Sequence, residues 1–170
     1  TDPVRVSVTP AATTAERVSQ QVTFVDQKEK PALLAMALKA AQIDRALVFT
    51  RTKHGADRVV RQLQACGISS VAIHGNKSQA QRTTALQAFR DGRVRILIAT
   101  DIAARGIDVS GVSHVFNYEL PNVAEQYVHR IGRTARAGAE GIAISFCAGD
   151  EKSYLRDIEK LTRIKLDVVP

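Results

Sequence analysis

Short runs of apolar and β-branched residues alternate along this chain with longer segments whose apolar residues recur at helical spacing. The runs that predict buried strands are 45–50, 71–74, 94–100, 112–118 and 141–146. The segments that predict helices are 28–41, 52–65, 78–90, 123–133 and 150–162. Gly67 and Gly92 stand where helix C-caps belong, and Ser78 with Gln81 has the spacing of a capping box. This serial order predicts one open α/β domain, with a largely parallel sheet covered by helices on both faces.

Composition agrees with one globular domain, since 45% of the 170 residues are hydrophobic and 24% are charged. The two cysteines, Cys66 and Cys147, form no metal-binding pattern, so we expect no structural metal and a reducing cytoplasm. No apolar run approaches the roughly 18 residues that cross a bilayer, and the first 16 residues lack the layout of a signal peptide. We therefore expect no membrane partner. We also expect residues 1–16 to be a linker or the tail of an upstream domain, and residues 17–170 to form the domain itself.

The net charge of +7 favours a polyanionic partner, although a basic solubilising surface would also account for it. Only 5% of the residues are aromatic and none is Trp, so few side chains could stack on bases. A nucleic acid would therefore be bound through its backbone, in a salt-sensitive way, rather than read by sequence.

Polar residues follow four of the predicted strands, at 50–53, 74–78, 100–108 and 117–121. Ligands of open parallel sheets bind outside the carboxyl ends of the strands. The hydroxyl, amide and lysine groups of these loops suit phosphate oxygens. One such loop more often serves a turn or a helix cap, but their coincidence after four strands indicates a phosphate-binding edge.

Arg130, Arg133 and Arg136 recur every three residues. On a helix they would fan over about a third of the circumference and form one basic face. Guanidinium groups suit phosphate, whereas a solvated stripe or carboxylate-paired arginines are the alternatives that the spacing leaves open.

Two nucleotide-binding patterns are missing from the sequence. Neither G-x-x-x-x-G-K-[ST] nor G-x-G-x-x-G occurs, and no acidic pair follows a predicted strand. We therefore do not expect this chain to hold and hydrolyse a nucleoside triphosphate by itself.

Residues 99–108 (ATDIAARGID) and 127–138 (YVHRIGRTARAG) closely resemble motifs V and VI of the DEAD-box RNA helicases. Val48 and Phe49 with Thr52 resemble motif IV, and the family's H-G-D and Q-x-x-R are matched by His74, Gly75, Gln79 and Arg82. His129 favours RNA-directed members over DNA helicases. The chain thus resembles the second, C-terminal RecA-like domain of such a helicase, and 150–160 resembles the bacterial RhlE-type subgroup.

The resemblance implies a role for each matching residue. Arg133 and Arg136 would be arginine fingers that reach the γ-phosphate of ATP, which the N-terminal RecA-like domain would hold together with Mg²⁺. His129 and Arg130 would couple ATP to RNA, and Asp108 would accept a hydrogen bond from the ATP ribose. The residues implied to bind the RNA backbone are Thr52, Gly75, Arg82, Thr100 and Gly106, with Gln79 positioning that region.

Three positions depart from the commonest family pattern: Asn76 and Glu119 replace Asp, and Ala135 replaces Gly. None of them is a residue to which the resemblance assigns ATP or RNA. The sequence therefore predicts the C-terminal domain of an ATP-dependent RNA helicase that needs its N-terminal RecA-like domain in cis and is inactive as a fragment. Ribosome-assembly and RNA-degradation machinery are candidate partners. The rival interpretations are a non-enzymatic nucleic-acid-binding module and a DNA-directed helicase domain, and the arginine spacing favours a helicase over the module.

Overall fold

A single parallel sheet organises the domain. The computed structural model describes residues 18–40, 43–105, 112–134 and 141–170, so the predicted linker at 1–16 lies outside the described residues. The sheet order is β3-β4-β2-β5-β6-β1-β7, and every described strand pair is parallel. The strands are β1 (Val18–Phe24), β2 (Ala46–Phe49), β3 (Val71–Ile73), β4 (Ile96–Ala99), β5 (His114–Asn117), β6 (Gly141–Cys147) and β7 (Asp167–Val168). The predicted α/β class is confirmed.

The helices follow the sequence pattern closely. They are α2 (Lys30–Ala40), α3 (Lys53–Ala65), α4 (Gln79–Arg90), α5 (Asp101–Ala104), α6 (Ala124–Ile131) and α7 (Lys152–Thr162), with 3₁₀ turns η2 (Gln27–Glu29) and η3 (Gly149–Glu151). The four-residue α5 was too short to leave a periodic signal. Among the described helices, none has the length and apolar character needed to span a membrane.

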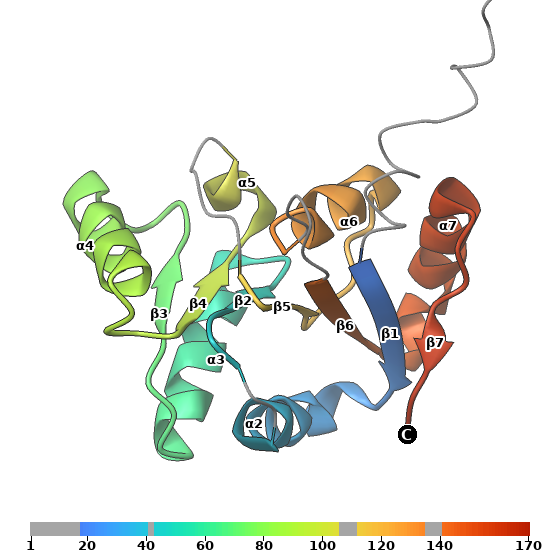
Figure 1. Ribbon diagram of the computed structural model, residues 1–170, viewed down its shortest axis with the longest axis horizontal. Coiled ribbons are helices and arrows are strands. Elements are labelled where there is room, and N and C mark those ends of the chain that lie inside the picture. The colour runs from blue at the N-terminus through green and yellow to red at the C-terminus, as the bar shows by residue number, and fades with distance from the viewer. Residues whose placement is uncertain (1–17, 41–42, 106–111, 135–140) are drawn as a thin grey trace, which may run out of the picture.

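Helices cover both faces of the sheet, because side chains along each strand alternate between the faces. Ala46 and Val48 of β2 pack with α2 and α3, whereas Leu47 and Phe49 pack with α4 and α5. Helices α6 and α7 cover β1 and β6 through a third apolar cluster that contains Tyr127. Figure 1 shows α2 and α3 on one side of the sheet and α4, α5 and α6 on the other.

The ends of the helices distinguish the two edges of the sheet. At the carboxyl edge, Thr52, Ser78 and Thr100 are the N-caps of α3, α4 and α5, and Ser78 forms the predicted capping box with Gln81. At the amino edge, α3 and α4 are followed by Gly67 and Gly92, which have φ values of 81° and 79°. Such left-handed turns favour glycine, so both predicted C-caps are confirmed.

Candidate functional site

Four neighbouring strands, β3, β4, β2 and β5, bring their carboxyl ends to one edge of the sheet. The polar segments that follow them therefore converge, as predicted, where the structure describes them. This carboxyl edge is the candidate site, and the described contacts divide it into a threonine-rich part and an arginine-rich part.

The loop after β2 is built around two threonines. Thr52 Oγ1 accepts a hydrogen bond from Gly55 N at 3.0 Å, and Thr50 Oγ1 donates to the carbonyl oxygen of Thr52 at 3.0 Å. Thr52 is nevertheless exposed, while Thr50 is fully buried beneath it. The fold thus fixes the Thr52 backbone and leaves its side chain accessible to a ligand.

A buried histidine shapes the loop after β3. His74 Nδ1 accepts a hydrogen bond from Asn76 N at 3.1 Å, so Nε2 carries the proton and donates to Asp57 Oδ1 at 2.8 Å. Partial burial raises the pKa of Asp57, but the hydrogen bonds and electrostatic attraction of His74 and Lys77 together outweigh it and hold that pKa below its ordinary value. The neighbouring Gly75 is exposed, with open space around its Cα.

One side-chain contact joins these two loops. Lys53 Nζ donates to Asn76 Oδ1 at 3.2 Å. An amide oxygen accepts this hydrogen bond as a carboxylate would, so the departure at Asn76 removes a charge and keeps the link. Gln79 and Arg82 lie in the first turn of α4, and the side chain of neither makes a hydrogen bond or ion pair within the described ranges. Their polar groups can therefore bind a ligand without breaking a described contact.

Arg130 is the centre of the arginine-rich part. Its guanidinium is buried, with 1% side-chain exposure, and makes a two-pronged pair with Asp101: Nε lies 2.7 Å from Oδ1 and Nη2 lies 2.8 Å from Oδ2. Nη1 donates to Asn117 Oδ1 at 3.2 Å and to the carbonyl oxygen of Glu119 at 2.6 Å. The group also stacks 5.0 Å from the centre of the Phe49 ring. These contacts join α6 to the segments that follow β4 and β5.

The prediction of one basic helical face is wrong for Arg130 and Arg133, and the alternative of a carboxylate partner holds for Arg130. Helix α6 ends at Ile131, so Arg133 follows the helix in a turn, and Arg130 points into the protein instead of outward. The spacing of three cannot place residues on one face beyond a helix end, and Asp101 offers Arg130 a buried partner. Arg136 lies outside the described residues, as do Gly106, Asp108 and Ala135.

Arg133 and His129 border a small cavity beside the buried pair. Its volume is about 120 Å³, and its lining includes Asp101 and Arg130 as well. Arg133 Nη2 donates to the carbonyl oxygen of Ala104 at 3.0 Å, so the residue bridges the end of α6 to α5 while staying half-exposed. His129 is exposed. Thr100 caps α5 nearby through a long, 3.4 Å hydrogen bond from Ala103 N.

A buried ionic group behind this edge was not predicted from the sequence. Glu151 accepts hydrogen bonds from Lys30 Nζ at 2.6 Å, Leu120 N at 2.9 Å and Ala148 N at 3.0 Å, and Arg51 Nη2 lies 3.3 Å away. Arg51 N in turn donates to Glu119 Oε1 at 2.8 Å, so the departure at Glu119 has a specific partner. Its members come from distant parts of the sequence, and only the position of Glu151 in the first turn of the predicted helix 150–162 gave any signal.

Within the described ranges, no three side chains of His, Cys, Asp or Glu lie close enough together to hold a metal ion. Asp101 is the one acidic side chain among the described residues that line the small cavity, and both of its oxygens are engaged by Arg130.

The parallel sheet and the candidate site at its carboxyl edge together define a RecA-like domain of the kind that helicases use. The model of the helicase conserved C-terminal domain matches residues 29–138, and this chain belongs to that family. Its similarity to DEAD-box proteins identifies it as a C-terminal RecA-like domain of the DEAD-box type.

The similarity covers almost the whole chain. The DEAD-box ATP-dependent RNA helicase CshA of Bacillus subtilis is 42% identical over 98% of this chain, which spans 34% of that relative's length. The structure of the E. coli DEAD-box protein SrmB bound to regulator of ribonuclease activity A has a TM-score of 0.86 and 36% identity, covering 90% of this chain and 91% of that one. The structure of S. cerevisiae Dbp5 bound to RNA and ADP BeF3 has a TM-score of 0.83 and 32% identity, covering 91% and 42%. The RhlE-type assignment stays a prediction.

Proposed function

We propose that this domain is the C-terminal half of an ATP-dependent RNA helicase, in which it binds the RNA backbone and supplies arginine fingers to ATP on an N-terminal RecA-like domain. The observation that carries the proposal is the buried Arg130–Asp101 pair, which locks the segment matching motif VI onto the segment matching motif V. The Dbp5 relative binds RNA and ADP BeF3, which is the ligand pair that the proposal requires.

The threonine-rich part of the edge is assigned to RNA. Thr52 and Gly75 are exposed, and the side chain of Arg82 makes no described hydrogen bond. A hydroxyl, an unobstructed backbone and a guanidinium are therefore available to phosphate and sugar oxygens. Thr100 and Gln79 belong to the same edge, and we assign Gly106 to it from the sequence alone. Contacts of this kind bind RNA without reading its sequence.

The arginine-rich part is assigned to ATP. The Arg133 guanidinium donates through Nη2 to the carbonyl oxygen of Ala104 and is half-exposed, so it lies at the surface of this edge, which suits a finger that meets a phosphate on another domain. Arg136 as a second finger and Asp108 as the ribose contact are proposed from the sequence motifs. Mg²⁺ would neutralise the phosphate charge, and we assign it with ATP mainly to the N-terminal domain, because the acidic side chain beside the cavity already pairs with Arg130.

Arg130 acts as a positioning residue in this proposal. Its four acceptors are all protein groups, so it orients α6, and with it His129 and Arg133, against the ends of β4 and β5. His129 lines the small cavity with both arginines and is proposed to pass the state of the ATP site to the RNA edge. A non-enzymatic binding module would not need Arg133 placed at such an edge.

The partners and location of the protein are proposed from the sequence and from one relative. The SrmB relative is bound to a regulator of ribonuclease activity, so we keep RNA-degradation machinery as a candidate partner. Ribosome-assembly machinery as a partner and the cytoplasm as the location stay predictions.

The proposal is tested by measuring ATP hydrolysis with and without single-stranded RNA, for the chain alone and for the chain joined to an N-terminal RecA-like helicase domain. We expect no hydrolysis by the chain alone and RNA-stimulated hydrolysis by the joined protein. Hydrolysis by the chain alone would mean that it holds a nucleotide site of its own.

Inactivity of both proteins, with RNA binding retained, would favour the non-enzymatic module. Competition between RNA and DNA of the same sequence for the joined protein separates the DNA-directed helicase, since stimulation by DNA alone would contradict the RNA assignment.

A further inference from the structure

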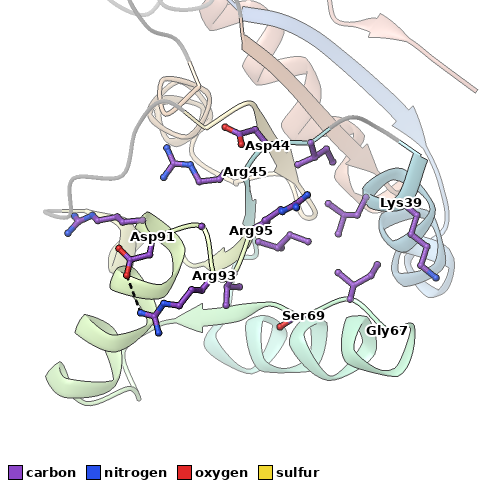
Figure 2. A pocket seen from close by; sticks show the side chains of 15 residues that line it. Lys39, Asp44, Arg45, Gly67, Ser69, Asp91, Arg93 and Arg95 are labelled. Atoms are coloured by element: carbon purple, nitrogen blue, oxygen red, sulfur yellow. Dashed lines mark hydrogen bonds and ion pairs between the residues drawn. The ribbon is translucent and has the colours of Figure 1, made fainter.

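A large cavity lies at the amino edge of the sheet, opposite the proposed ATP and RNA edge. Its volume is about 1110 Å³, and it is formed by the ends of α2, α3 and α4 and by the segments that enter β2 and β4 (Figure 2). Neither the sequence motifs nor the proposed function uses any of its residues.

The cavity is strongly basic. Its cationic side chains are Lys39, Arg45, Arg90, Arg93 and Arg95. They outnumber the carboxylates of Asp44 and Asp91 by three, in a chain whose net charge is +7. A concave surface lined mainly by one sign of charge raises the local concentration of ligands of the opposite sign.

Helix ends account for only part of this charge. Lys39 and Arg90 lie in the last turns of α2 and α4, where cations stabilise the negative end of the helix dipole. Arg93 pairs with Asp91 at 3.3 Å, but both side chains are exposed, at 64% and 44%, so the pair contributes little to stability. The remaining two arginines, Arg45 and Arg95, belong to no helix.

Arg45 and Arg95 are held next to each other by the sheet itself. They immediately precede β2 and β4, and Ala46 N donates to the carbonyl oxygen of Arg95 at 2.8 Å. The guanidinium of Arg45 is further fixed 5.2 Å from the centre of the Phe89 ring, and the side chain of Arg95 is exposed.

The chemistry of the cavity selects a phosphate-rich ligand. Guanidinium forks match phosphate oxygens in a two-pronged way. No aromatic side chain is among the described residues that line the cavity, so bases would find no stacking platform there. Its size exceeds that of a single small anion. We propose that this amino-edge cavity, through Arg45, Arg93 and Arg95, is a second contact site for the phosphodiester backbone of RNA.

The test measures RNA binding by the 170-residue chain. The readout is the fluorescence anisotropy of a labelled single strand of about twenty uridines, recorded at several salt concentrations. The variant Arg93→Gln with Arg95→Gln removes two exposed charges from the cavity. The matched control, Arg156→Gln with Lys160→Gln, removes two exposed charges from α7. We expect the cavity variant to bind about tenfold more weakly, with a salt slope smaller by about 0.7 for each lost phosphate contact, while the control changes little.

Equal losses in the cavity variant and the control would overturn the proposal, because only net charge would then matter. Binding of inorganic tripolyphosphate or of polyglutamate that the cavity variant loses, with RNA binding unchanged, would also overturn it in favour of a free polyphosphate or an acidic peptide. Arg82→Ala, measured in parallel, tests the carboxyl edge independently. If Arg82→Ala has no effect while the cavity variant binds weakly, the RNA part of the proposed function fails and the second site stands.

Discussion

Replacing Arg130 with methionine should destabilise the domain strongly, although the family resemblance assigns this residue to coupling. The side chain is 1% exposed and makes four hydrogen bonds to protein groups. Methionine retains an apolar stem against Phe49 but leaves the Asp101 carboxylate, which is 15% exposed, without its partner. The carbonyl oxygen of Glu119 loses a 2.6 Å hydrogen bond as well.

The size of the effect follows from these contacts. Removing one partner of a buried ion pair costs about 3–5 kcal/mol, because the remaining charge stays buried. Domains unfold with a total free energy of about 5–15 kcal/mol, so the loss is a large fraction. With a urea dependence of about 2 kcal/mol per molar, the unfolding midpoint should fall by about 1.5–2.5 M. Arg133→Met is the matched control, since Arg133 is half-exposed and should cost only about 0.5–1.5 kcal/mol.

Urea unfolding followed by circular dichroism measures both variants. The double variant Arg130→Met with Asp101→Asn should be less destabilised than the sum of its single variants, because it leaves no buried charge unpaired. A loss below about 1 kcal/mol for Arg130→Met, or additive losses in the double variant, would refute the buried-pair account.

Three further predictions concern stability and reactivity. Gly141→Ala should lower the free energy of unfolding in urea by about 1–3 kcal/mol, because the new Cβ would overlap the side chain of Thr134, which a hydrogen bond holds in place. The control Gly149→Ala, where the new Cβ enters open space, should change little. Burial lowers the pKa of His114, so below about pH 6.5 the unfolded chain binds a proton that the folded one does not. Stability should therefore fall as the pH drops through this range, and His114→Gln should reduce the fall; an unchanged pH profile would contradict this. Iodoacetamide at about pH 8 should modify exposed Cys66 and spare Cys147, whose pKa burial raises to about 11, and equal labelling in a mass spectrum would disprove this.

The sequence was sufficient for the fold because its signals are local. Apolar runs, helical spacing, the Ser78 capping box and the turns at Gly67 and Gly92 each report on a few neighbouring residues, and all agree with the structure. Strand β1 was missed because its sequence, VSQQVTF, neither alternates cleanly nor forms an apolar run. The two-residue β7 and the four-residue α5 were missed because elements this short show no period.

The site was predictable in outline but not in its ionic contacts. Parallel strands placed the loops at one edge, as the alternation of strands and helices implied. The partner of Arg130 lies 29 residues away, and the partner of Glu151 at Lys30 lies 121 residues away. Spacing along a helix says nothing about such distant partners, so Arg130 was placed on a basic surface when it belongs to a buried pair.

The central claim is that this domain completes an ATP site on another domain through Arg133. The most direct measurement is RNA-stimulated ATP hydrolysis by the chain joined to an N-terminal RecA-like helicase domain, with and without Arg133→Ala. We predict a loss of about 10³-fold or more in turnover, with RNA binding nearly unchanged and the urea midpoint lowered by no more than about 0.75 M. Unchanged turnover would contradict the finger role and the account built on it.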